Sequence, residues 1–350
     1  MDLKNRTLED WLKDAPDAAY QYGKKIDFYS PYKTLKDYLK REVHSQVNLG
    51  ANLKDPDILI NDHGSDHVDA VIERATSLVC SETCELSPLE VFMLLVAIQL
   101  HDVGNIFGRY EHEINSDEIL LEAEKLIGRD SVDRTIIRNI AQTHGGEIRG
   151  IGKKKDTIGL IAENETLLDG HVRQRAIAGI LRFADELADD KRRAYTTLLR
   201  ENKIPKKSEV FHAYATCLDA VKIDHKEKYV ELIFRIPKDF MLHKFGKMNE
   251  TIYLLDEIYN RAVKIHLERI YFMRFCRDLI EINKIFVYIK FYDQYLEVFK
   301  PITFELYESG YPEAGSDDIY GLCPSLKDEK GKKINGEYVR RKLTGKNDEF

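Results

Sequence analysis

Residues 94–104 read LLVAIQLHDVG, an apolar segment that ends on an adjacent histidine and aspartate. Residues 87–90, SPLE, precede it with the pattern of a capping box and a proline at the first helical position, so the segment is expected to end a helix. Gly104 is expected to close that helix, because glycine tolerates the positive φ of a cap. Burying His101 beside Asp102 is costly unless a partner compensates both groups, and a divalent metal does so directly. The pair therefore predicts a metal site.

The composition is that of a globular protein with one large domain or two ordinary ones. The chain has 350 residues, of which 43% are hydrophobic and 32% are charged. A formal net charge of -7 gives no general attraction to nucleic acid, so phosphate binding must come from local basic clusters or from a metal.

Cysteine usage and the N-terminus bear on the compartment. Five cysteines, an odd number, favour a reducing compartment over a disulfide framework. The N-terminus lacks the apolar stretch of a signal peptide, and no apolar run approaches the roughly 18 residues of a membrane span. We expect a cytoplasmic protein without membrane contact.

The spacing of apolar residues divides the chain into four predicted segments. Residues 1–60 are expected to form a helical extension. Residues 61–202 carry apolar residues at helical spacing, and residues 209–310 carry runs of β-branched and aromatic residues that alternate as in strands. Residues 311–350 are polar and indicate a weakly packed tail.

Within residues 209–310 the predicted order is strand, strand, helix, strand, strand, which indicates a small α+β domain. The predicted elements are strands at 210–221, 229–236, 285–291 and 302–307 and a helix at about 250–278. The expected fold class is therefore mainly α, with a helical domain followed by a small α+β domain.

Two further predicted helices carry polar residues suited to metal ligation. His67 lies on the edge of the apolar stripe of a helix that should start within residues 62–66. Asp185 interrupts the apolar face of a helix predicted at 172–190, so its carboxylate needs a partner. Together with His101 and Asp102, these side chains could meet around one ion.

This order, H then HD then D, resembles the HD superfamily of metal-dependent phosphohydrolases over about residues 60–195. The resemblance implies a helical HD-type phosphohydrolase domain whose ion is held by His67, His101, Asp102 and Asp185. It further implies open positions for water and a phosphate oxygen, with a metal-bound hydroxide as the nucleophile. Mixed nitrogen and oxygen ligands suit Mn, Fe, Co, Ni or Zn more than Mg alone.

Two more histidines leave the number of ions open. His112 and His144 are similar in placement to the additional ligands of two-metal HD enzymes such as the HD-GYP phosphodiesterases, so His144 is a candidate ligand of a second ion. The double histidine of those enzymes is only Thr143-His144 here, and Asn105 stands where the HD-x-G-K form has lysine.

His112 has an alternative role. His112-Glu113 resembles the His-Glu pair of the deoxynucleoside triphosphate triphosphohydrolases, which implies two catalytic residues with His112 as general acid. A surface pair or a metal ligand are the other interpretations. Those enzymes follow the doublet with a Gly-His-Pro-Phe type of run, where residues 104–108 read GNIFG, and carry an arginine where Gly64 stands.

Several basic residues are candidate substrate contacts, with a solvated loop or a structural polar group as the alternative interpretation. They are Arg109, His63, Lys153, Lys154, Lys155 and Arg192.

The predicted substrate is a nucleotide, with a (deoxy)nucleoside triphosphate favoured by His112-Glu113 and the basic loop at residues 153–155. The layout also looks like that of HD proteins from bacterial conflict and anti-phage systems, which implies a role in antiviral defence. The alternatives are a nuclease or cyclic-nucleotide phosphodiesterase, with nucleic acid as a possible substrate class, and a nucleotide-sensing regulatory protein without turnover. We expect a homo-oligomer.

Overall fold

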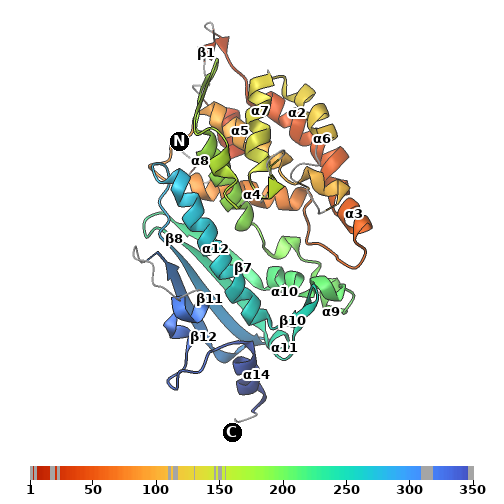
Figure 1. Cartoon of the computed structure of the whole chain (residues 1–350), viewed down its shortest axis with the longest axis vertical. Coiled ribbons are helices and arrows are strands. Elements are labelled where there is room, and N and C mark those ends of the chain that lie inside the picture. The colour runs from red at the N-terminus through yellow and green to blue at the C-terminus, as the bar shows by residue number, and fades with distance from the viewer. Residues whose placement is uncertain are drawn as a thin grey trace. The chain divides into compact units, whose positions relative to one another are not determined.

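A computed structural model describes residues 3, 6–15, 20–21, 24–108, 112, 117–129, 131–145, 147–148, 152–153, 155–308 and 318–345 (Figure 1). The chain divides into two compact units. Unit 1 comprises Met1–Pro56, Asp62–Ala188 and Tyr271–Glu281. Unit 2 comprises Asp57–Asn61, Asp189–Ile270 and Ile282–Phe350.

Helix α5 (Pro88–Leu100) is the centre of unit 1. The predicted capping box is confirmed, because the Ser87 hydroxyl accepts the Glu90 amide while the Glu90 carboxylate accepts the Ser87 amide. Every residue from Leu89 to Leu100 is buried, so α5 has no solvent-facing side. It packs against five helices, namely α1 (Leu8–Asp14), α2 (Tyr29–Leu39), α4 (Ser65–Val79), α7 (Ser131–Gln142) and α8 (Gln174–Glu186).

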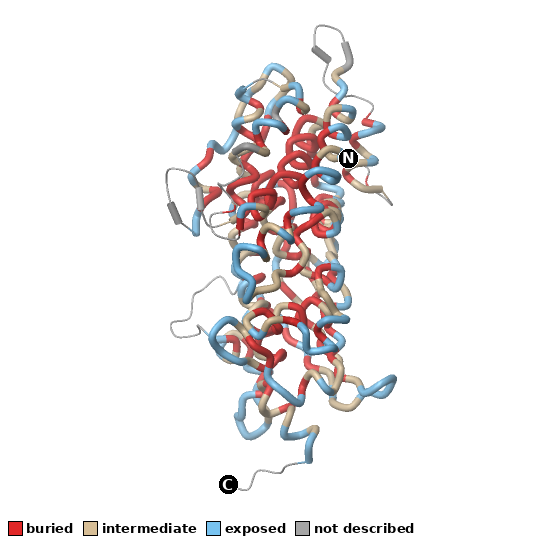
Figure 2. Tube along the Cα trace, turned by 90° about the vertical axis from the view of Figure 1, so that its right-hand side faces the viewer, coloured by how far each residue is buried: buried red, intermediate tan, exposed pale blue. Residues whose placement is uncertain are grey.

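The burial of α5 explains why its sequence is so apolar. Pro88–Phe107 is long and apolar enough to cross a membrane by length and composition alone, but nearly all of it is buried inside the protein. Figure 2 shows the buried residues gathered in the interior of the helical part of the chain. A core helix surrounded by other helices explains this hydropathy without a membrane.

Shorter elements complete unit 1. They are the π-helix η1 (Lys40–His44), α3 (Ser45–Lys54), the 3-10 helices η2 (Val103–Phe107) and η3 (Ile158–Leu160), α6 (Asp117–Ile127), and three hairpins formed by β1 (Tyr20–Gln21) with β2 (Lys24–Lys25), β3 (Glu147–Ile148) with β4 (Gly152–Lys153), and β5 (Glu165–Leu167) with β6 (Gly170–Val172). Helix α3 packs on η2, the short helix that follows the His-Asp pair.

A four-stranded sheet of order β12-β11-β8-β7 is the frame of unit 2. Its strands are β7 (Leu218–Asp224), β8 (Tyr229–Pro237), β11 (Lys284–Asp293) and β12 (Leu296–Tyr307). The central strands β8 and β11 are parallel, and both edge strands are antiparallel to their neighbours. Helix α12 (Leu254–Cys276) makes the crossover between the two parallel strands and lies along the sheet in Figure 1.

The remaining elements of unit 2 are short. They are η4 (Lys191–Arg193), α9 (Thr196–Arg200), η5 (Lys206–Ser208), α10 (Glu209–Cys217), α11 (Lys238–Met241), β9 (Phe245–Lys247), β10 (Glu250–Ile252), α13 (Ile319–Leu322), η6 (Pro324–Leu326) and α14 (Gly336–Thr344). Residues assigned from the sequence to a polar tail thus include α14, whose Val339 is fully buried.

The predicted fold class is confirmed, with a helical domain followed by a sheet-containing region. Two predicted boundaries are wrong. The strand predicted at 210–221 begins only at Leu218, because residues 209–217 form α10. The buried residues Val210, Ala213, Tyr214 and Cys217 follow a helical spacing, which outweighs the aromatic and β-branched composition. The long helix starts at Leu254, after the short strand β10.

Candidate metal centre

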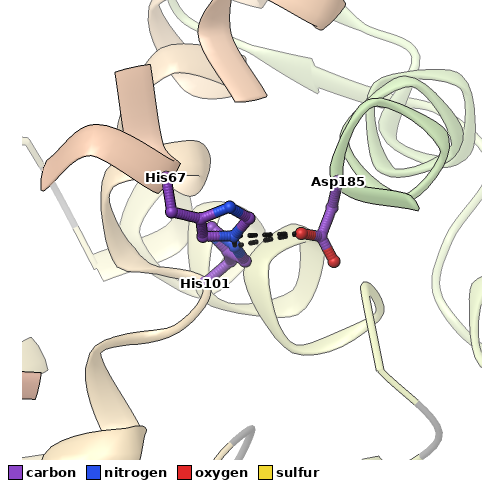
Figure 3. Close-up of side chains that lie close together, drawn as sticks. All are labelled: His67, His101 and Asp185. Atoms are coloured by element: carbon purple, nitrogen blue, oxygen red, sulfur yellow. Dashed lines mark hydrogen bonds and ion pairs between the residues drawn. The ribbon is translucent and has the colours of Figure 1, made fainter. Parts of the chain in front are cut away.

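Three side chains from different parts of unit 1 point toward one another (Figure 3). His67 comes from α4, His101 follows the last residue of α5, and Asp185 lies near the end of α8. The Nε2 atoms of the two histidines are 3.3 Å apart, and Asp185 Oδ1 lies 3.1 Å from Nε2 of His67 and 3.7 Å from that of His101. We call His67, His101 and Asp185 the first group.

Asp102 stands between this group and a second one. Its Oδ2 atom lies 3.4 Å from Nε2 of both His67 and His101. Its Oδ1 atom lies 3.3 Å from His112 Nε2 and 3.6 Å from His144 Nε2. We call Asp102, His112 and His144 the second group, so one carboxylate presents a different oxygen to each group.

Short backbone contacts orient the histidines. His101 Nδ1 is 2.7 Å from the carbonyl oxygen of Ile98, and His144 Nδ1 is 2.5 Å from that of Ala141, three residues earlier in each case. If each Nδ1 carries the proton and donates it to the carbonyl, Nε2 keeps its lone pair and faces the centre. Asn105 Nδ2 donates to Asp102 Oδ1 over 2.9 Å and fixes the rotation of that carboxylate.

Gly104 has a different role from the predicted one. Its φ is not positive, so it does not close the helix as a left-handed cap; that conformation occurs at Gly108, with a φ of 116°. A Cβ atom on Gly104 would instead lie 1.8 Å from the carbonyl oxygen of His112. Glycine is needed here because the main chain of His112 approaches η2 closely, and this approach brings His112 to Asp102.

Helix α3 supports the same region from the other side. A Cβ on Gly50 would lie 2.0 Å from the carbonyl oxygen of Ile106 in η2. Asn48 Oδ1 accepts the amide of His63 over 2.8 Å, and its Nδ2 donates to the carboxylate of Asp62. Helix α3 therefore fixes both η2 and the turn from which α4 begins.

His144 is positioned by the loop at residues 155–157. The Thr157 hydroxyl lies 2.9 Å from the carbonyl oxygen of Thr143 and 3.2 Å from that of Gly145, so it can donate to either of the residues that flank His144. Arg182 of α8 donates to the Thr157 hydroxyl over 3.0 Å. The turn after α7 is thus connected to the helix that carries Asp185.

Burial and charge act in opposite directions within the centre. Burial lowers the pKa of His101, but the carboxylates of Asp102 and Asp185 outweigh it and raise that pKa to about 10. Burial raises the pKa of both aspartates, and the nearby histidines outweigh burial and hold these pKa values well below their ordinary range. Without an ion, a protonated His101 therefore balances the two buried carboxylates, and a bound cation would take the place of its Nε2 proton.

These residues fit a divalent cation. Nitrogen and oxygen donors about 2.1 Å from a tetrahedral ion lie about 3.4 Å from one another. Separations of 3.1 to 3.7 Å among the first group and Asp102 agree with that spacing. Each group has its ligand atoms within 4.8 Å of one another. His67, His101, Asp102 and Asp185 would hold one ion, and His112 and His144 would complete a place for a second one with Asp102.

The candidate substrate contacts are divided by the structure. His63 is buried, with Nε2 4.0 Å from Asp102 Oδ2, so it lies at the centre. Lys155 is exposed, and it is its carbonyl oxygen that accepts from Arg182 of α8. Arg192 is in unit 2, where its guanidinium pairs with Asp190 over 2.8 Å. Arg109, Glu113, Lys154 and the side chain of Lys153 lie outside the described residues.

Sequence reasoning overlooked the supports of the centre. In the sequence Asn105 stands out only as a departure from the HD-x-G-K motif, yet in the structure it is fully buried and donates a hydrogen bond to Asp102. Its place one helical turn after Asp102 was the available signal. Asn48 and Gly50 gave none, because their partners are distant in sequence.

One comparison with known proteins finds a match. The family model HD-CE, an HD-type domain, matches residues 55–259, a range that contains all six residues of the two groups. No curated protein sequence matches the chain.

Proposed function

Since the chain belongs to the HD-CE family, whose model covers more than half of its length, we propose that it is a phosphohydrolase acting on a nucleotide. The HD-type domain and its buried histidines and aspartates indicate a metal-dependent hydrolase. The finer proposal is that the bond cleaved is a phosphoester or phosphoanhydride, and that the first substrate to test is a (deoxy)nucleoside triphosphate. A defence role against phage is part of this proposal.

One arrangement supports this chemistry above all, namely the two oxygens of Asp102 facing two groups of histidines. A divalent ion bound there would lower the pKa of a coordinated water and polarise a phosphoryl oxygen. The side chains supply the rest: His101 and His144 keep Nε2 available through their Nδ1 contacts, and Asn105 prevents Asp102 from rotating. Burial keeps bulk water from competing for these groups.

His112 decides between two substrate classes. Its Nε2 is 3.3 Å from Asp102 Oδ1, and its ring centroid is 5.5 Å from that of His144. Such a place suits a ligand of a second ion better than a proton donor to a leaving group. A phosphodiesterase acting on cyclic nucleotides or nucleic acid is therefore the second candidate function, because two ions can stabilise both the attacking and the leaving oxygen.

The test uses the full chain, purified with Mn, and a pool of nucleoside triphosphates, cyclic nucleotides and single-stranded oligonucleotides. Mass spectrometry identifies the products, and elemental analysis counts the bound metal. We expect release of phosphate or triphosphate from nucleotides in the favoured case, and monoesters from cyclic nucleotides or oligonucleotides in the second. The matched control is His171→Ala, which changes an exposed histidine of the same unit.

Two results would decide against this proposal. Recovery of an intact bound nucleotide after long incubation would favour a sensor without turnover. Equal turnover by the protein and by a His101→Ala, Asp102→Ala variant would show that the activity comes from a contaminant or from another site.

A further inference from the structure

We propose that the outer face of the unit 2 sheet binds a second copy of this chain, as a two-fold symmetric, reversible dimer. The outer face consists of the side chains that alternate with the buried ones on the two central strands. Its main members are Ile233, Arg235, Phe286, Tyr288, Lys290 and Tyr292.

The opposite face of the sheet is already occupied. The Tyr214 ring of α10 packs on Phe234, and the Tyr259 ring of α12 packs on Phe304, with centroids 5.3 and 5.4 Å apart. Val230, Val287 and the other inward residues of the central strands are fully buried. On the outer face, by contrast, Arg235 is exposed and its neighbours on β11 are only partly buried.

Aromatic and apolar residues occupy the middle of the outer face. Tyr288 is in register with Ile233 on the neighbouring strand, and Phe286 precedes Tyr288 by two residues on the same side. Aromatic residues and arginine are enriched in the centres of protein interfaces, where charged residues other than arginine are depleted. The middle of the outer face has this composition.

One end of the outer face is basic. Arg235 and Lys290 are in register two residues beyond the central row. The Arg235 guanidinium lies 5.4 Å from the Tyr292 ring centroid and the Lys290 ammonium 5.0 Å from the Tyr288 ring centroid. One carboxylate, Glu297 on the edge strand, is in register with Tyr292. The charges of Arg200 and Asp219 also act on the pKa of Tyr292, so among these six described residues the cations outnumber the anions by one.

At the other end of the outer face, carboxylates outnumber lysines. Glu231 and Glu305 flank Phe286 in the row two residues before the centre, and Asp224 follows at the end of β7. Lys222 lies 3.5 Å from Glu231 and Lys284 3.1 Å from Glu305. Three carboxylates thus face two lysines, so the ends of the outer face have opposite net charge.

This pattern is complementary to itself. A two-fold axis that lies in the interface along the row of Ile233 and Tyr288 would place Arg235 of one copy over Glu231 of the other. Each basic end would then meet an acidic end, as an isologous contact requires. A nucleic acid strand fits less well, because its phosphates would meet the carboxylates of the acidic end.

The size of the outer face suits a reversible dimer. The two central strands pair over nine residues, or about 30 Å, and four strands span about 19 Å. Two such faces cover about 1,100 Å² together, which is near the lower limit of specific interfaces. The dimer should therefore dissociate on dilution.

The test is sedimentation velocity of the full chain over a hundredfold range of concentration around about 10 μM. We expect a monomer–dimer equilibrium. Arg235→Glu with Lys290→Glu makes both ends acidic, and Glu231→Lys with Glu305→Lys makes both ends basic, so each variant should dissociate at least about tenfold more easily. The exposed Lys244→Glu, whose ammonium lies 5.2 Å from the Tyr253 ring centroid just before α12, is the matched control and should change nothing.

Mixing the two variants separates charge complementarity from misfolding. An equimolar mixture should dimerise at least as tightly as the unchanged protein, which misfolded chains would not do. A protein that is monomeric throughout, or a dimer that Arg235→Glu with Lys290→Glu does not weaken, would overturn the proposal. So would a monomer whose binding of a single-stranded oligonucleotide is lost in that variant, since the face would then bind nucleic acid.

Discussion

The two groups of the candidate centre are held in different ways. His67 and Asp185 lie within α4 and α8, and His101 directly follows the buried helix α5. In the second group, His112 and His144 lie in turns and are held by close backbone approaches and side-chain contacts to carbonyl groups. Helix packing thus determines the first group and loop structure the second. We expect the second group to be the more easily disturbed.

The largest effect should come from a double substitution that removes ligands from both groups. His101→Ala with Asp102→Ala takes one ligand from the first group and the shared carboxylate. Bound metal should disappear, and turnover should fall at least about 10³-fold, because a metal ion contributes several kcal/mol to such reactions. Elemental analysis and product assays check this, and near-native turnover with no bound metal would contradict it.

His112→Ala tests whether the second group holds its own ion. If His112 is a ligand, the metal count should drop from two to one per chain while the first ion stays, with turnover reduced about 10²-fold. The count should be unchanged if His112 instead transfers a proton, and one limb of the pH–rate profile should then be lost. His144→Ala should lower the metal count from two to one and should leave the shape of the pH–rate profile unchanged.

Gly104→Ala should disturb the second group without removing any donor. The added Cβ would lie 1.8 Å from the His112 carbonyl oxygen, so the turn must move by more than 1 Å, which is enough to cost about tenfold to a hundredfold in rate. The first ion should remain. Gly128→Ala is the matched control, since its φ of 66° is strained but a Cβ there meets nothing within 4 Å. Equal metal loss in both variants would contradict a specific effect on His112.

The smallest effect should appear in how the free energy of unfolding depends on pH, through His44, which contacts the helix that precedes His101. Burial lowers the pKa of His44 to about 4, and His44 Nε2 is 2.9 Å from the Gln99 carbonyl oxygen of α5. With an unfolded pKa near about 6.5, the unfolded chain takes up a proton that the folded one refuses, so stability falls as pH drops from about 6.5 to about 4. Between pH 7 and pH 5, the His44→Gln protein should lose about 2 kcal/mol less of its free energy of unfolding than the unchanged protein. Urea unfolding of the metal-free proteins measures it, and identical pH dependence would contradict it.

The elements of the first group could be predicted from the sequence, whereas the placement of the second group could not. Helical spacing of apolar residues predicted the helices of His67 and Asp185, and the capping box predicted α5, because these signals are local. The placement of His112 against η2 depends on an approach between main chains eight residues apart, which no side-chain pattern reports. The same approach explains why the role predicted for Gly104 is wrong. The prediction of α10 as a strand is wrong for another reason, because its composition favours a strand while its buried residues have helical spacing.

The close packing of Gly50 on Ile106 has a practical consequence for anyone trimming this protein. Helix α3 precedes residues 55–259, the range that matches the HD-CE family. Its Asn48 nevertheless contacts His63 inside that range, so α3 supports the candidate metal centre. A recombinant fragment restricted to residues 55–259 would expose η2 and leave the turn before α4 without its anchor. A fragment that keeps this region folded should therefore reach upstream to include Ser45–Lys54, and also α1 and α2, which pack on α5.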